Sequence, residues 1–190
     1  MSKLTGKRIA ILATDGFEES ELLKPREALD VEGAKTTVVS LATGTIQGMK
    51  HDKKGETVKV DATLESVKEG DFDALLLPGG VANPDALRMN AKAVELVAAF
   101  VRANKPIAAI CHGPWTLIET GVVKGKTMTS WPSLKTDLTN AGAKWVDREV
   151  VTDGNLVTSR KPDDIPAFVK AFVELLMPSV PQKASAQAQA

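Results

Sequence analysis

The sequence predicts an α/β protein, a three-layer α/β/α sandwich around a mainly parallel sheet. Continuous apolar runs of strand length recur along the chain, as in residues 8–14 (RIAILAT) and 107–110 (IAAI). Such runs are typical of parallel strands buried on both faces. They alternate with segments whose apolar residues have helical spacing, which is the pattern of an α/β fold. Small or reactive residues follow several strands directly, at the sheet edge where such folds bind ligands.

The first strand, helix and strand form a βαβ unit. Residues 8–14 predict the first strand, and residues 18–32 predict an amphipathic helix that ends at Gly33. Pro25 lies inside that helix and predicts a kink or a later start. Residues 36–41 predict the second strand, with a right-handed crossover between the two.

The middle of the chain contains a hairpin, a strand and a broken helix. Residues 44–60 lack a helical period and predict a small antiparallel hairpin. Residues 73–77 (DALLL) predict a core strand that runs into Pro78-Gly79-Gly80. A double glycine there lets backbone N–H groups approach a ligand, so this is a candidate oxyanion or phosphate loop. Residues 85–102 predict helix with a break near Asn90.

The last elements follow the same alternation. Residues 127–130 predict a short strand and residues 134–141 a short helix. Residues 150–158 predict a hairpin, because Asp153-Gly154 is typical of a type I′ turn. Residues 163–177 begin with acidic residues and proline and continue with helical spacing, which predicts a final helix packed on the sheet.

Length and composition indicate one domain with a tail. The chain has 190 residues, a size at which one domain buries a large core without disulfides or metal. We expect a single domain over residues 1–177. Residues 178–190 are rich in Pro, Ala, Gln and Ser and predict a disordered tail.

Charge and cysteine content restrict the partners and the compartment. Twenty-four basic and twenty-four acidic residues give no net charge, so we expect neither a specific nucleic-acid partner nor an anionic membrane. The one cysteine cannot form an internal disulfide, and no apolar run matches a signal peptide or a membrane span. We therefore expect a cytoplasmic protein that needs no cofactor.

Cys111 is the candidate nucleophile. It ends an apolar strand, and Pro114 follows as a helix-start signal. Ala109 and Gly113 flank it at the positions where a nucleophile elbow requires small side chains. An elbow places the sulfur near a helix N-terminus, which favours a thiolate. The alternative is that Cys111 is an inert buried residue, as most free cysteines are.

Only two histidines could activate this cysteine. The chain contains His51 and His112, so the arrangement of class I glutamine amidotransferases, with a histidine far downstream of the cysteine, is excluded. His112 is the better candidate because it is adjacent to Cys111. His51 lies in a lysine- and glycine-rich segment, where a solvated histidine is expected.

Several motifs together resemble one family. AICHGP at the elbow, LLLPGG before it, DGFEESEL after the first strand and GAKWVDREVVTDGNLVTSR near the end resemble the ThiJ/PfpI family, close to its intracellular protease I branch. The resemblance runs over about residues 8–177. It implies a flavodoxin-like α/β/α sandwich with a nucleophile elbow.

The resemblance also implies residue roles. Cys111 matches the family nucleophile, His112 the family histidine, and Glu18 a protonated glutamic acid that hydrogen-bonds the thiolate. Asp85 occupies the place of a carboxylate that orients the histidine of a neighbouring subunit, which implies a homodimer or larger homo-oligomer. The backbone N–H groups of Gly80 and His112 would form an oxyanion pocket.

Three functions are consistent with these residues. The first is a stress-associated cysteine enzyme, either a peptidase-like hydrolase or a deglycase or glyoxalase acting on methylglyoxal adducts, with a peptide or a small carbonyl compound as substrate. The second is a redox sensor in which Cys111 is oxidised. The third is a chaperone-like stress protein. The enzyme is favoured because a nucleophile elbow stores backbone strain that a passive protein has little reason to keep.

Overall fold

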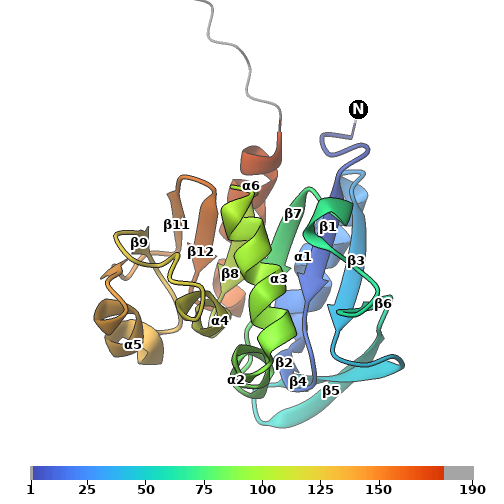
Figure 1. Ribbon diagram of the computed structural model, residues 1–190, viewed down its shortest axis with the longest axis horizontal. Helices are drawn as coiled ribbons and strands as arrows, with labels where there is room; N and C mark the ends of the chain where they lie inside the picture. The colour runs from blue at the N-terminus through green and yellow to red at the C-terminus, as the bar shows by residue number, and fades with distance from the viewer. Residues whose placement is uncertain (1, 178–190) are drawn as a thin grey trace, which may run out of the picture.

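The central sheet has seven strands, six of them parallel (Figure 1). Only the edge strand β11 runs antiparallel to its neighbour. The computed structural model describes residues 2–177, so the predicted disordered tail at 178–190 lies outside the described residues. In sheet order the strands are β11 (Val150–Asp153), β12 (Leu156–Ser159), β8 (Ile107–Ile110), β7 (Ala74–Leu77), β1 (Arg8–Leu12), β3 (Lys35–Ser40) and β6 (Ala62–Thr63).

Both faces of the sheet are covered, which gives the three layers that the sequence predicts. Alternate residues of β1 enter different cores: Ile9 and Ile11 belong to one buried cluster, and Ala10 and Leu12 to the other. This is the period of two that a strand imposes. The first core includes side chains of α1 (Glu19–Val31) and α6 (Ile165–Leu176). The second includes side chains of α2 (Ala82–Met89), α3 (Ala91–Arg102), α4 (Pro114–Ile118) and α5 (Lys135–Asn140).

The order of the strands places a ligand crevice beside β1. From β1 the chain moves outward to β3 and β6, and then returns to the other side of β1 as β7. This is the flavodoxin-like order, and ligands bind at the carboxyl ends of the strands where the direction reverses. The loops after β1, β7 and β8 all meet at this edge, as the alternation of strands and helices predicts.

Two small sheets complete the fold. The predicted hairpin is confirmed as β4 (Thr45–Lys50) and β5 (Lys53–Lys59), which joins β2 (Phe17–Glu18) beside the crevice. The other pair is β9 (Thr127–Met128) and β10 (Lys144–Trp145). Three single turns of 3-10 helix link the elements: η1 (Glu69–Asp71), η2 (Pro132–Leu134) and η3 (Pro162–Asp164).

The structure confirms the helix break predicted near Asn90 and corrects the later helix start predicted from Pro25. Asn90 separates α2 from α3, and its side chain caps α3 by accepting the N–H groups of Lys92 and Ala93. The later start predicted from Pro25 is wrong, because α1 begins at Glu19 and contains Pro25. The missing N–H removes one helical hydrogen bond, and burial of the helix against the core offsets that loss.

The turn between β11 and β12 lies one residue later than predicted. Asp153 pairs with Leu156, so Gly154 and Asn155 are the two turn residues. The Asp153 carboxylate accepts the Thr127 N–H at 2.8 Å and so holds Asp153 in the strand. Gly154, with φ at 61°, supplies the positive angle that a primed turn needs.

Among residues 2–177, no helix has the length and apolar character that crossing a membrane requires.

We predict that Gly113→Ala destabilises the fold while Gly70→Ala does not. A Cβ at Gly113 would lie 2.5 Å from the Leu77 carbonyl oxygen and 3.0 Å from that of Ile110. Such overpacking costs about 1–3 kcal/mol. Gly70 has no atom within 4 Å of its Cβ position, so its change should stay within about 0.5 kcal/mol. Urea denaturation of both variants measures this, and equal midpoints would contradict tight packing at the elbow.

Candidate active site

Cys111 lies on a sharp turn between β8 and α4. Its φ is 61°, a left-handed backbone conformation that is uncommon for a residue other than glycine. Two backbone hydrogen bonds hold this turn: the Cys111 N–H donates to Ser159 O at 3.1 Å, and Cys111 O accepts from the Trp131 N–H at 2.9 Å. The predicted nucleophile elbow is therefore confirmed, and it stores backbone strain of the kind concentrated at functional sites.

The elbow faces a cavity of about 490 Å³. Cys111 lies in its wall and is largely buried, with 7% of its surface exposed. The lining residues come from the segments that follow β1, β7 and β8, from helix α1, from the β4–β5 hairpin and from two segments further along the chain. They are Gly16, Glu18, Glu21, Met49, His51, Gly80, Val81, Ala82, Cys111, His112, Trp131 and Pro162.

The imidazole of His112 contacts the sulfur directly. His112 Nδ1 lies 3.2 Å from Cys111 Sγ, and Nε2 lies 3.3 Å from Ser133 Oγ. Trp115 meets the ring edge-on at 5.1 Å between centroids, and Trp131 stacks on it at 6.2 Å. Burial lowers the pKa of His112, because desolvation disfavours the imidazolium. His112 is therefore neutral at physiological pH and can accept a proton.

Glu21 supplies a buried carboxyl next to the thiol. Its side chain is fully buried and interacts with Cys111, and its Oε2 accepts the Gly79 N–H at 2.9 Å. Its Oε1 has no hydrogen-bond partner among the described residues. Burial, together with the charge of Glu18, raises the pKa of Glu21 to about 8. Glu21 therefore holds its proton at neutral pH.

The close approach of Glu21 and Cys111 requires glycine at position 79. A Cβ on Gly79 would lie 2.5 Å from Glu21 Oε2 and 2.6 Å from Cys111 Cβ. Both distances are well below van der Waals contact. The first glycine of the predicted loop thus leaves room for the carboxyl and the elbow to meet.

The structure corrects the role expected of Glu18. Glu18 precedes α1, and its Oε2 accepts the His51 N–H at 3.0 Å, so it lines the cavity instead of contacting the thiol. Glu21 lies one helical turn further, on the face of α1 that also buries Pro25 and Leu29. Glu21, Pro25 and Leu29 are spaced four residues apart, which places a glutamate on the apolar face of α1. The sequence contains this signal, but sequence reasoning missed it.

The predicted thiolate is also corrected. Burial raises the pKa of the Cys111 thiol, and the charge of an ionised Glu21 would raise it further. Backbone hydrogen bonding from Gly80 and His112 opposes this shift, but its effect on the pKa is smaller than that of burial. Helix α4 has only five residues, so its dipole gives little help. The sulfur accordingly carries its proton until a base removes it.

The other predicted residues have distinct places. Gly80 and His51 line the cavity, so His51 belongs to the site although its side chain is exposed. Asp85 is exposed in the first turn of α2, and no contact joins it to His112 within the described chain. Its action across a subunit interface stays a prediction. Trp131 is 39% exposed at the cavity.

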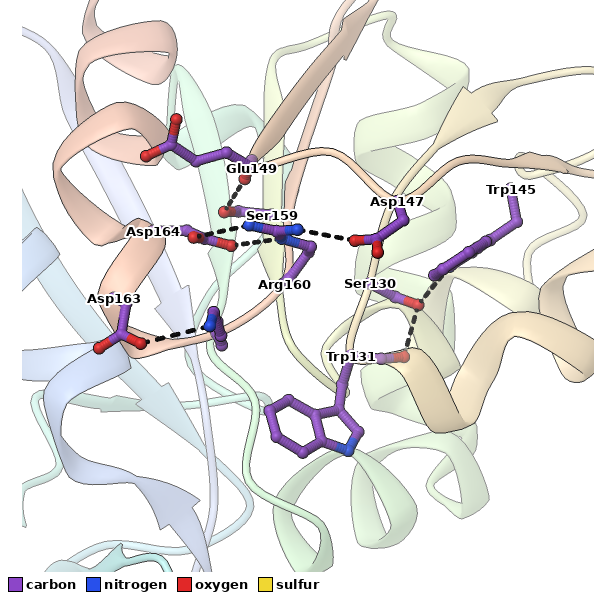
Figure 2. Close-up of polar contacts among 10 residues, drawn as sticks. Ser130, Trp131, Trp145, Asp147, Glu149, Ser159, Arg160, Asp163 and Asp164 are labelled. Atoms are coloured by element: carbon purple, nitrogen blue, oxygen red, sulfur yellow. Dashed lines mark hydrogen bonds and ion pairs between the residues drawn. The ribbon is translucent and has the colours of Figure 1, made fainter.

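An ion-pair network fixes the segment that follows β12 and brings Pro162 to the cavity. Figure 2 shows Arg160 between Asp147 and Asp164. Its Nε donates to Asp164 Oδ2 at 2.8 Å and its Nη1 to Asp147 Oδ1 at 2.7 Å. Asp164 is buried, so this pairing holds the turn that contains Pro162 beside the cavity.

Fold and site together define a class of protein. A flavodoxin-like sheet carries a strained cysteine at the switch-point edge, with a neutral imidazole and a protonated carboxyl beside it. This is the architecture of an α/β protein with a candidate cysteine nucleophile. Residues 7–175 match the sequence model of the DJ-1/PfpI family, and the chain belongs to that family.

Similar proteins agree with this assignment. A deglycase of Pyrococcus abyssi is 48% identical over 89% of this chain and 99% of its own length. General stress protein 18 of Bacillus subtilis is 44% identical over 90% and 98%. The crystal structure of Drosophila melanogaster DJ-1beta has a TM-score of 0.81 and 33% identity, covering 90% of each chain. Such relatives support a stress-associated, hydrolase-type enzyme of this family.

We predict that stability depends on pH through Glu21. Its pKa is about 8 in the folded protein against 4.5 when unperturbed, so the folded state binds this proton more tightly. The contribution to the free energy of unfolding is complete below pH 4.5 and is lost as pH rises through 8, a total of roughly 5 kcal/mol. Glu21→Gln should flatten this dependence, and exposed Glu27→Gln on the same helix should not.

Urea denaturation of the three proteins at pH 5, 7 and 9 measures the effect. Parallel pH profiles for Glu21→Gln and the unchanged protein would show that Glu21 is ionised when folded.

Proposed function

We propose that this protein is a cysteine-dependent hydrolase of the deglycase and glyoxalase type, acting on small carbonyl compounds and their adducts. One observation carries the proposal: the Cys111 sulfur faces a cavity of about 490 Å³ between a neutral imidazole and a protonated buried carboxyl. Such a site can form a covalent adduct and then move a proton on it. The names of similar proteins, including the deglycase of Pyrococcus abyssi, support the same reaction class.

The first step is addition of sulfur to an aldehyde carbon. His112 Nδ1, 3.2 Å from the sulfur, accepts the thiol proton as the C–S bond forms. Negative charge then develops on the former carbonyl oxygen. We assign stabilisation of this charge to the backbone N–H groups of Gly80 and His112. The proposal is supported by the hydrogen-bonding effect of both backbones on the pKa of Cys111. His112 returns the proton to that oxygen and gives a neutral hemithioacetal.

The second step uses Glu21. In the hemithioacetal of methylglyoxal, one C–H bond next to sulfur must break and one must form on the neighbouring ketone carbon. Glu21 holds its proton at rest and has an unpaired Oε1, so it first donates that proton to the ketone oxygen of the adduct. The resulting carboxylate takes the proton of the breaking C–H bond and delivers it to the neighbouring carbon. It then recovers a proton from the hydroxyl next to sulfur as the thioester carbonyl forms. The product is a thioester of lactate, which water hydrolyses to lactate and free thiol.

An amine adduct of methylglyoxal requires one step before these. The Cys111 sulfur displaces the nitrogen from the carbon that carries it, and the amine leaves with the proton that His112 took from the thiol.

Peptide hydrolysis is the second candidate within the same class. It would use the same sulfur and the same oxyanion N–H groups. The burial of Cys111, which is 7% exposed, favours a small molecule, because a polypeptide would need an extended segment inside the cavity. The redox-sensor and chaperone interpretations remain alternatives that turnover assays separate from catalysis.

We expect Cys111→Ala to abolish conversion of methylglyoxal to lactate and Glu21→Gln to lower kcat by about 10²- to 10⁴-fold, the usual contribution of a positioned acid–base group. Glu27→Gln should match the unchanged protein, because Glu27 is exposed on α1 away from the lining residues. Lactate formation and amine release from a methylglyoxal-treated amino acid measure both reactions. A fluorogenic peptide tests peptidase activity.

Two results would refute this function. Full methylglyoxal turnover by Cys111→Ala would exclude cysteine catalysis, and turnover of the peptide alone would assign the site to a peptidase.

A further inference from the structure

The far side of the His112 ring carries a contact that the proposed reaction has not used. Ser133 Oγ lies 3.3 Å from His112 Nε2. Within residues 2–177 it is the one hydrogen-bond partner of that nitrogen. Cys111, His112 and Ser133 thus form a continuous chain from thiol to imidazole to hydroxyl.

The ring is held so that each nitrogen faces one partner. Trp131 stacks on its face with planes 23° apart, and Trp115 meets it edge-on. His112 is 7% exposed, which leaves little room for the ring to turn over. Nδ1 therefore stays toward the sulfur, and Nε2 stays toward Ser133.

A neutral imidazole carries one N–H, so its position decides whether His112 can act as a base. A proton on Nδ1 would block transfer from the thiol. A proton on Nε2 leaves the Nδ1 lone pair free to accept it. We propose that Ser133 is a positioning residue whose Oγ accepts the Nε2–H of His112 and so keeps Nδ1 unprotonated opposite Cys111. This role rests on the proposed function of the same site.

The segment that carries Ser133 is anchored to the elbow itself. The Trp131 N–H donates to the Cys111 carbonyl oxygen at 2.9 Å. The Trp131 carbonyl accepts from Ser130 Oγ, which in turn accepts from Trp145 Nε1 at 3.0 Å (Figure 2). Ser133 follows in the single turn η2, and the next residue, Leu134, is fully buried. The backbone that carries the exposed Ser133 side chain is consequently held close to Cys111.

The decisive experiment is ¹⁵N NMR of the full chain labelled at histidine. Only two imidazoles contribute, since the chain has two histidines, and His51→Gln assigns the signals. At pH 7 we expect His112 as the Nε2–H tautomer. Ser133→Ala should give a mixture of tautomers, and Ser133→Thr, which keeps the hydroxyl, should restore the original spectrum.

Thr136→Ala is the matched control, because it removes an exposed hydroxyl from the adjacent helix α5 without a side-chain hydrogen bond among the described residues. It should leave the spectrum and turnover unchanged. An Nδ1–H tautomer in the unchanged protein, or an unaltered spectrum in Ser133→Ala, would overturn the proposal. A spectrum altered by Asp85→Asn and not by Ser133→Ala would assign the role to a carboxylate instead.

Kinetics give a second readout. Loss of one hydrogen bond that water can partly replace should lower kcat on the order of tenfold in Ser133→Ala and leave KM unchanged. Ser133→Thr should recover most of this loss, and an unchanged kcat in Ser133→Ala would contradict the role. Absence of turnover in the unchanged protein would refute the proposed function, whereas the tautomer of His112 would still test the placement of Ser133.

Discussion

The left-handed backbone at Cys111 is the constraint on which the site depends. It turns the chain from β8 into α4 within the three residues 111–113 and directs the sulfur to the carboxyl edge of the sheet. The same turn presents the Cys111 carbonyl to the Trp131 N–H, so the strained residue also fixes a second wall of the cavity. Gly79 and Gly113 surround it because any Cβ there would overlap neighbouring atoms.

The burial of Glu21 gives the site its chemical character. Helix α1 packs its apolar face on the sheet and carries this carboxyl out of water. Because a buried carboxylate without a cation is costly, Glu21 keeps its proton, and the single Gly79 N–H does not reverse that preference. The same exclusion of water raises the pKa of the thiol and lowers that of His112. Both pKa shifts keep the thiol and the imidazole neutral at rest, and the two groups then exchange protons during the reaction.

Local patterns in the sequence predicted the fold well and the site in part. Apolar strands, helical spacing and glycine positions gave the order of the elements, because each depends on residues close together in the chain. The predicted turn at Asp153 was one residue early, since a distant Thr127 N–H holds that carboxylate in the strand. Glu18 was chosen over Glu21 for a related reason: the sequence shows two glutamates three residues apart but not which one the sheet covers.

The sequence by itself determined the α/β fold, the elbow at Cys111 and the adjacent imidazole of His112, all of which follow from contiguous residues. Only the tertiary structure decided that Glu21 meets the thiol and that Ser133 meets the far nitrogen of the imidazole. Glu21 reaches Gly79 across 58 residues of chain, and Ser133 reaches His112 across 21. Such contacts depend on how a helix and a turn are rotated against the sheet, and that rotation is set by packing of the whole core.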